Sequence, residues 1–451
     1  MSTIFEFCLP DFTDDQLAPV GDVDLSIPLS LGAICGYWRD IAWSTPTLWS
    51  SLVIRVTWRH SPHIVTSIAH EWLSRSGQLP LSIRICTKVE RYDYVMHKTV
   101  QGLADIINRY STRWSDLDLY IPKHYYQHFR ATDNHAPILK SIRFNSSANH
   151  DAKLKNFQLT CPRLERALLS DFLLYGINIQ WDNLTHLTLH SMLINDSFLI
   201  LRKTPRLVFC KVSGSRRGVI GSIGTVVLTS LKSLQLTTFV RELLDNLITP
   251  HLEEFNLQNS FLRPLEVAVI ILFFRRSACS LRSLSVAFPL YFEFFVEGFM
   301  GFLQSMPSLN TLSTTSGDFD PRFIFQLVAK VLSSQSTSQG PQQGFLPNLK
   351  IFEYTGKLNL RPEFFDDLHS LLPAYSNAVH GPLQLIKIDL TQHRLPKNLI
   401  PFFSNIAERG VTVNVTSKSE DIIQTSIDYF RRRGDFFEQD WVDNLDSSLF
   451  S

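Results

Sequence analysis

The stretch Leu184-Thr185-His186-Leu187-Thr188-Leu189 decides the fold, because it is one copy of a unit that recurs along the chain. The same pattern, Leu-x-x-apolar-x-apolar, begins again at Leu231, Leu252 and Leu281. Looser copies begin at Trp114, Leu139, Leu164, Leu207, Leu309, Leu349 and Leu385. From Trp114 to Leu309 the copies begin 20 to 29 residues apart, and two longer steps follow.

Each copy predicts a short strand with one buried face, because its apolar residues alternate with polar ones. The segments 241–249 and 265–276 favour helices, as does 63–76, and further strands are expected at 81–86 and 411–415. One strand and one helix cannot bury their own apolar faces, so the copies must stack. Pattern and period together resemble leucine-rich repeats. The resemblance implies an α/β fold, a leucine-rich-repeat solenoid or horseshoe.

The expected turns depart from the usual repeat. Many such families place Asn or Cys a fixed step after the last Leu, where its side chain ties the turn. This chain has Met192, Phe239 and Ser260 in that slot. We therefore expect irregular turns.

A second resemblance lies near the N-terminus. Ile34-Cys35-Gly36-Tyr37-Trp38-Arg39, followed by Leu48-Trp49, resembles the second half of an F-box, and Trp72 to Gly77 resembles the segment that follows it in fungal F-box proteins with leucine-rich repeats. The resemblance implies an all-α cap that binds the Skp-type adaptor, and through it the cullin, of an SCF-type ubiquitin ligase. The repeats would hold an unknown substrate protein. The residues that match the family's adaptor-binding positions are Leu31, Ile34, Cys35 and Trp38 of its third helix, and Ile4, Phe5, Leu9 and Pro10 at the end of its first.

The F-box resemblance is incomplete. The family's opening Leu-Pro-x-Glu is absent, and an acidic insertion occupies 11–28. Either upstream residues are missing from this sequence, or half of the box has been lost. Under the alternative interpretation, Ile34, Cys35 and Trp38 form the core of a small helical cap, and the protein is a repeat scaffold that no longer binds the adaptor.

Three domains follow from these patterns. An F-box-like segment is expected over 1–55, and irregular leucine-rich repeats over 61–416 with a flexible Ser- and Gln-rich insertion at 333–344. A capping helix and acidic tail are expected over 417–451. Ser417 and Glu420 have capping-box spacing, and Arg431-Arg432-Arg433-Gly434 is typical of a helix end. Alternatively, the arginine run is a localisation or nucleic-acid signal. The tail is either a peptide ligand for a partner or a frayed end.

Composition excludes several partners and compartments. The formal net charge is +1 and no stretch is strongly basic, so we expect no nucleic-acid or membrane partner. The six cysteines include no C-x-x-C pair and predict core thiols in a reducing cytoplasm or nucleus. The N-terminus is a poor signal peptide, and the longest apolar run, 267–274, is too short to span a bilayer.

No catalytic motif is present, so the sequence predicts a binding protein without enzyme activity, cofactor or metal. His124 and His128 lie four residues apart, but exposed loop histidines explain them better than a metal site. Gly218, Gly221 and Gly224 are better explained by a turn than by a nucleotide-binding loop.

The polar residues between the leucines of each strand predict an open binding face. Exposed aromatic side chains dominate interface energies, so Tyr120 and Phe209 are the strongest candidates, followed by Arg143. The remaining expected substrate-binding residues are His186, His190 and Lys211. No arginine cluster that could receive a phosphate is expected on this face, and the identity of the substrate is left open.

Overall fold

The computed structural model describes residues 27–57, 61–87, 94–145, 157–214, 224–258, 264–288, 296–316, 326–331, 345–356 and 383–432, apart from 172–173, 175–176, 238–240, 329, 392–393, 396, 409 and 419. The chain divides into two compact units, residues 1–230 and residues 231–451, which are called unit 1 and unit 2 below. Each is a mixed α/β unit built on a mostly parallel sheet. Ile4, Phe5, Leu9, Pro10, the insertion 333–344 and the tail beyond 432 lie outside the described residues.

The sheet of unit 1 consists of parallel strands that follow one another in chain order. Its strands are β1 (Ser51–Val56), β2 (Leu81–Thr87), β3 (Trp114–Tyr120), β4 (Ser141–Asn145), β6 (Arg166–Ser170), β8 (His186–His190) and β9 (Phe209–Ser213). The short strands β5 (Phe157–Leu159) and β7 (Ile177–Ile179) pair with each other, and β10 (Val226–Val227) follows β9. The predicted period-two pattern is confirmed, because alternate residues of β1, β4 and β8 are buried.

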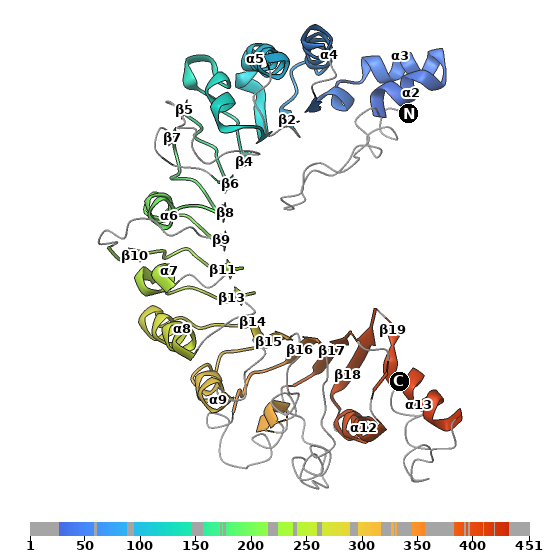
Figure 1. Cartoon of the computed structure of the whole chain (residues 1–451), viewed down its shortest axis with the longest axis vertical. Helices are drawn as coiled ribbons and strands as arrows, with labels where there is room; N and C mark the ends of the chain where they lie inside the picture. The colour runs from blue at the N-terminus through green and yellow to red at the C-terminus, as the bar shows by residue number, and fades with distance from the viewer. Residues whose placement is uncertain are drawn as a thin grey trace. The chain divides into compact units, whose positions relative to one another are not determined.

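Helices cover one face of this sheet. In Figure 1, α4 (Pro62–Arg75), α5 (Tyr94–Asn108) and α6 (Ile194–Leu201) lie on the same side of the unit 1 strands. Short 3-10 turns complete the layer at η2 (Ser111–Arg113), η3 (Lys123–His128) and η4 (Thr132–Asn134). The other face carries no helix from the described part of unit 1 and is called the open face of unit 1.

The turns around the strands repeat the same contacts. Before β6 and β8 the backbone N–H of Leu164 and Leu184 donates to the carbonyl three residues earlier. Asn183 ties this turn to the preceding one, because its Nδ2 donates to the Pro162 carbonyl at 2.7 Å. After β6 and β8, Asp171 and Ser191 both have positive φ, at 58° and 50°. The turns after β6 and β8 thus begin alike. Of the three residues on which the expectation of irregular turns rests, Met192 is buried, and Phe239 and Ser260 lie outside the described residues.

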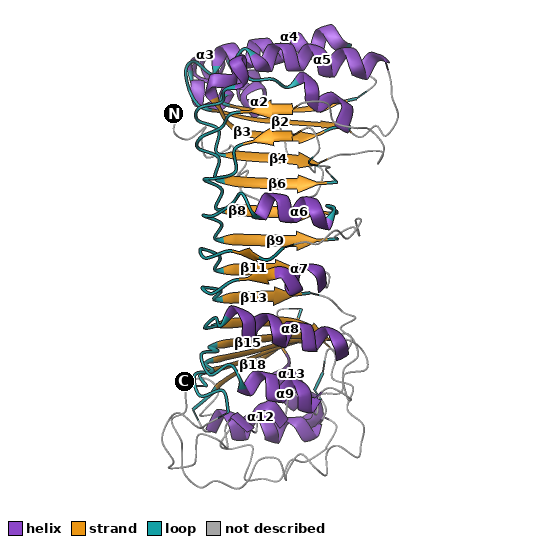
Figure 2. Ribbon diagram, turned by 90° about the vertical axis from the view of Figure 1, so that its left-hand side faces the viewer, coloured by secondary structure: helices purple, strands orange, loops and turns teal. Residues whose placement is uncertain are grey.

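The sheet of unit 2 also runs in chain order, parallel until its last strand. Its strands are β11 (Ser233–Leu236), β13 (Glu254–Leu257), β14 (Ser283–Phe288), β15 (Thr311–Ser316), β16 (Ile351–Gly356), β17 (Leu385–Leu390), β18 (Thr412–Ser417) and the antiparallel β19 (Glu420–Asp421). Its helices are α7 (Arg241–Asn246), α8 (Pro264–Ser277), α9 (Val296–Gln304), α12 (Ile400–Glu408) and α13 (Ile422–Arg432), with β12 (Leu247–Ile248) after α7 and η6 (Lys397–Leu399) before α12. Figure 2 shows β11 and β13 side by side, as successive copies of one unit should lie.

Two boundary predictions need correction. The sheet of unit 1 already begins with β1 (Ser51–Val56), so position 55 falls inside a strand and not at the end of a helical cap. The predicted capping box at Ser417 does not form, because Ser417 ends β18 and its buried Oγ has no hydrogen-bond partner. The last helix begins at Ile422 instead, where the Asp421 carboxylate accepts the Ile423 N–H at 2.8 Å. Sequence spacing alone could not show that strand pairing extends to residue 421.

The buried thiols behave as core residues. Cys86, Cys161 and Cys210 are free and buried, and burial raises the pKa of Cys161 and Cys210 to about 12. They are therefore uncharged and unreactive at neutral pH. Among the described residues, no helix is long and apolar enough to cross a bilayer.

Candidate functional site

The N-terminal helices of unit 1 expose apolar side chains. These helices are α2 (Ile27–Ile34) and α3 (Gly36–Ser44). Ile34 is 61% exposed, Tyr37 63% and Leu29 46%, although each side chain is large and apolar. Large apolar side chains exposed on one helix pair are candidates for contact with a partner. We call Leu29, Ile34 and Tyr37 the apolar cap surface.

Two side chains bring α2 and α3 into close contact. The ring of Trp43 lies directly on Gly32, where an added Cβ would come within 2.0 Å of the ring. Only glycine therefore fits at this crossing. Cys35 separates the two helices and caps α3, because its Sγ accepts the Trp38 N–H at 3.4 Å.

A row of tryptophans joins this helix pair to the first repeat. Trp43 packs edge-on against Trp49 of η1 (Pro46–Trp49), and Trp49 packs edge-on against Trp72 of α4, with ring centroids 5.5 Å and 4.8 Å apart. The Trp49 indole N–H donates to the Ala42 carbonyl at 2.8 Å, and the Trp72 indole N–H donates to Ser51 at the start of β1 at 3.0 Å. We call Trp43, Trp49 and Trp72 the tryptophan ladder.

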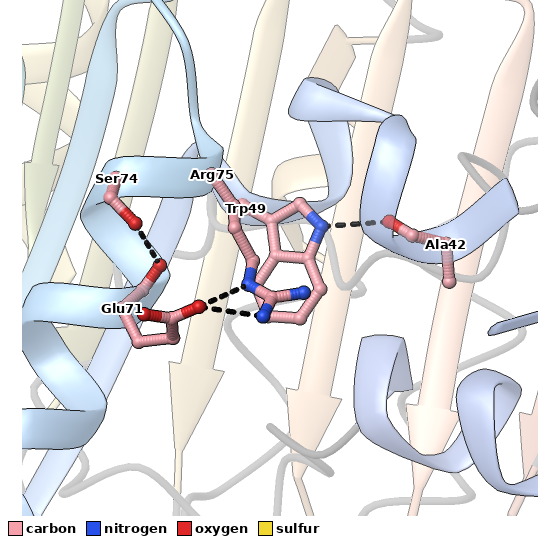
Figure 3. Close-up of polar contacts among 5 residues, drawn as sticks. All are labelled: Ala42, Trp49, Glu71, Ser74 and Arg75. Atoms are coloured by element: carbon pink, nitrogen blue, oxygen red, sulfur yellow. Dashed lines mark hydrogen bonds and ion pairs between the residues drawn. The ribbon is translucent and has the colours of Figure 1, made fainter. Parts of the chain in front are cut away.

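Arg75 adds a cation to the ladder, and Figure 3 shows its guanidinium beside the Trp49 ring and paired with Glu71. Its guanidinium lies 4.9 Å from the Trp43 ring centroid and 5.0 Å from that of Trp49. Glu71, one helical turn earlier on α4, orients it through an ion pair of 2.6 Å. Cation–π contacts are strongest when the cation is held over the ring face. Arg75 of α4 therefore stabilises the packing of Trp43 and Trp49, and with it the position of α3 against α4.

The family resemblance assigns Leu31, Ile34, Cys35 and Trp38 to one helix, but in the structure they are divided between two. Leu31 and Ile34 belong to α2, Trp38 belongs to α3, and Cys35 lies between the helices. The interpretation of Ile34 and Cys35 as buried core is wrong, because both are exposed. Leu31 and Trp38 are half-buried.

The second feature is the open face of unit 1, on which strand register sets three rows of side chains. The middle row contains Arg84, Asp118, Arg143, Leu168, Thr188 and Lys211. The row on its N-terminal side contains Asp116, Arg166, His186 and Phe209, and the row on its C-terminal side contains Arg55, Cys86, Tyr120, Asn145, His190 and Ser213. The structure thus brings all the predicted substrate-binding residues onto one sheet face.

The strongest contact on this face is an ion pair. Arg84 Nε lies 2.6 Å from Asp118 Oδ2, and the two side chains are only 18% and 23% exposed. Burial raises the pKa of the Asp118 carboxyl, while the nearby Arg84 and Arg143 act in the opposite direction. Asp118 therefore lies between two guanidinium groups.

The histidines and Phe209 are also held in place. The rings of His186 and Phe209 stack with centroids 5.8 Å apart and an interplanar angle of 27°. His190 Nδ1 lies 2.8 Å from Ser213 Oγ, and burial lowers the pKa of His190. This end of the face presents ordered aromatic and imidazole rings.

His124 and His128 were expected to be exposed loop residues, and this is wrong. They are half-buried in η3, where His97 of α5 joins them; the ring centroids of His97 and His128 are 5.7 Å apart. Burial lowers the pKa of His124, and repulsion from His97 and His128 lowers it further. Within the described ranges, no three His, Cys, Asp or Glu side chains are placed to hold a metal ion.

Sequence reasoning missed part of the open face. Arg55 of β1 and Arg84 of β2 lie on the same face as Arg143 and Arg166, spread over different rows and strands, with Asp118 between Arg84 and Arg143. The strand that carries Arg84 was expected at 81–86, but its outward residues were not among the candidates. Leu52-Val53-Ile54-Arg55-Val56 alternates in the same way but lacks the leading Leu-x-x of the repeat.

No protein-family model matches the chain, and no curated protein matches its sequence.

Proposed function

We propose that the chain is the substrate-recognition subunit of an SCF-type cullin–RING E3 ubiquitin ligase. In this proposal the cap helices hold the Skp-type adaptor, and the open face of leucine-rich repeats arranged as a solenoid holds the substrate protein. The observation that carries the proposal is the apolar cap surface on a helix pair that the tryptophan ladder fixes to the first repeat.

The exposure of these side chains has a physical cost that a partner would remove. Burying a large apolar side chain contributes about 1.5–3 kcal/mol. Ile34 and Tyr37 are more than half exposed. The contact between their two helices is made by Trp43 on Gly32 and does not involve either side chain. A rigid helix pair with one packed side and one exposed apolar side is suited to docking on a second protein.

The repeats support the second half of the proposal. In each unit, parallel strands succeed one another in chain order with helices on one side. The open face of unit 1 carries aromatic, cationic and polar side chains held by neighbouring strands. Such a preorganised mixed surface binds proteins without an active site.

A pull-down with purified Skp-type adaptor tests the proposal. We expect the full chain to retain the adaptor and the variant Ile34→Ala, Tyr37→Ala to lose at least about tenfold in affinity, since each 1.4 kcal/mol is a factor of ten. The matched control is Ile64→Ala, Ile68→Ala, which truncates two exposed isoleucines on α4 that are not part of the cap. This control should bind like the unchanged chain.

An alkylation footprint gives a second readout. Cys35 is exposed beside Ile34, whereas Cys86, Cys161 and Cys210 are buried. In a Cys8→Ser, Cys279→Ser background, the adaptor should protect Cys35 from iodoacetamide. If the unchanged chain neither retains the adaptor nor shows protection, the ligase assignment fails and the chain is a stand-alone repeat scaffold.

A further inference from the structure

The open face of unit 1 has a strong excess of positive charge. Its strands β1 to β9 place five cationic side chains on this face and two carboxylates; the cations are Arg55, Arg84, Arg143, Arg166 and Lys211, and the carboxylates Asp116 and Asp118. The whole chain carries a net charge of only +1, so this excess is local. The open face is more positive than the chain as a whole.

Strand pairing sets the spacing of the cations. Arg84 and Arg143 lie in the same row, two strands apart, with Asp118 between them. At about 4.8 Å per strand step, their Cα atoms are about 10 Å apart, and the row from Arg84 to Lys211 spans about 24 Å. An extended peptide rises about 3.3 Å per residue, so about seven residues would cross this row.

Asp118 orients the guanidinium groups on either side of it. Its ion pair with Arg84 fixes the direction of that guanidinium, and Arg143 lies close on the other side. A guanidinium already held in place loses less conformational freedom on binding than one that is mobile. Two aromatic side chains, Tyr120 and Phe209, lie on the same face and provide apolar contact beside the charges.

We propose that the open face of unit 1 binds a carboxylate-rich extended segment of a partner protein, laid across β2 to β9. This inference rests on the proposed function only in identifying the partner as the substrate. The excess of cations matches the charge of such a segment, and the alternate side chains of an extended segment all face the sheet, as those of an alternating Glu and Ser sequence would.

A protein segment fits this face better than a nucleic acid. Nucleic-acid surfaces combine many phosphate-binding cations with few carboxylates. Here Asp116 and Asp118 would lie against the phosphates. Every nucleotide carries a phosphate, so a nucleic-acid backbone that follows the middle row cannot avoid the half-buried Asp118 carboxylate, whereas a protein segment can place an uncharged residue opposite it.

Fluorescence anisotropy on the full chain tests the inference. The probe is a labelled nine-residue peptide of alternating Glu and Ser, compared with the same peptide carrying Gln for Glu. We expect the Glu peptide to bind and the Gln peptide not to bind. The variant Arg143→Gln, Lys211→Gln should weaken Glu-peptide binding at least about tenfold, because contacts to a charged group are worth about that factor each.

The matched control is Lys387→Gln, which removes a lysine from the corresponding strand position in unit 2. It should leave binding unchanged, and circular dichroism should show that every variant is folded. Equal binding of Glu and Gln peptides, or no loss in the double variant, would overturn the inference. So would tighter binding of a nine-nucleotide oligo-dT, which would assign the face to nucleic acid. The adaptor takes no part in this measurement, so its outcome is independent of the pull-down.

Discussion

The two units share one architecture but have opposite charge on the strand faces that point away from their buried residues. In unit 1 these positions carry five cations and two carboxylates, as described above. In unit 2 the corresponding positions of β11 to β18 carry Glu254, Glu353 and Asp389 against Lys387 alone. The remaining positions there are mainly Ser, Thr, Asn and Gln.

The difference teaches that the repeat pattern constrains only half of each strand. The buried positions must be apolar in both units, because they pack between sheet and helices. Leu187 and Leu284, on β8 and β14, are both fully buried. The positions between them have no such requirement, so each unit carries its own charge pattern, and this pattern is where binding differs.

The largest expected effect comes from making unit 1 resemble unit 2. The variant Arg143→Glu, Lys211→Glu reverses two of the cations, so an acidic segment would meet repulsion in place of attraction. We expect at least about a hundredfold loss of Glu-peptide affinity in the anisotropy assay. The new carboxylate beside Asp118 should also lower the thermal stability, so circular dichroism must show that the variant is folded at the assay temperature. Retained affinity would mean that the charge difference between the units has no part in binding.

An intermediate effect should separate the ion pairs of the two units. Arg84 and Asp118 are 18% and 23% exposed, whereas Lys387 and Glu353 in unit 2 are 51% and 35% exposed. We expect Arg84→Met to lower the free energy of unfolding by about 2 kcal/mol, since it removes the ion-pair partner of a half-buried carboxylate and leaves only the interaction with Arg143. Lys387→Met should cost less than about 1 kcal/mol, because the pair is screened by solvent.

Urea denaturation measures both losses, and Arg84→Met, Asp118→Leu is the control. Removing both charges should recover part of the stability that the single variant loses. Equal losses in the two units would contradict the difference in burial between the pairs.

The smallest effect concerns pH. The pKa of His124 and His128 is lowered first by burial and then by His97, and for His128 Arg130 also lowers it while Asp105 raises it. The unfolded chain therefore binds protons more readily, and unit 1 should lose stability as the pH falls below the ordinary histidine pKa of about 6.5.

Hydrogen exchange at pH 7.5 and 5.5, followed peptide by peptide, measures this loss in each unit. Exchange protection should fall in α5 and η3, and the variant His124→Gln, His128→Gln should reduce the fall. The described part of unit 2 holds no comparable histidine cluster and serves as the internal reference. An equal fall in both units would assign the effect to other groups.

The F-box resemblance shows how far sequence reasoning reached at the cap. Ile34, Cys35 and Trp38 are identified by their resemblance to the F-box motif, and the structure places them at adjoining helices. The tryptophan ladder was not predicted, although Trp49 and Trp72 stand in the segments that resemble the family. Edge-on packing of Trp49 on Trp72 joins residues from different elements, and spacing along a chain carries no information on such contacts.

The sequence by itself determined the strands of the repeat copies, because alternation of apolar and polar residues is a local property typical of a half-buried strand. It also determined which side chains of β3, β4, β8 and β9 face outward. Only the tertiary structure decided how those side chains meet. The register of parallel strands places Arg84 beside Asp118, the approach of α2 to α3 requires Gly32 under Trp43, and the packing of α5 on η3 gathers the histidines. These contacts depend on the stacking of successive repeats, whose loops vary in length, and the free energy of that stacking is shared among many residues far apart in the chain.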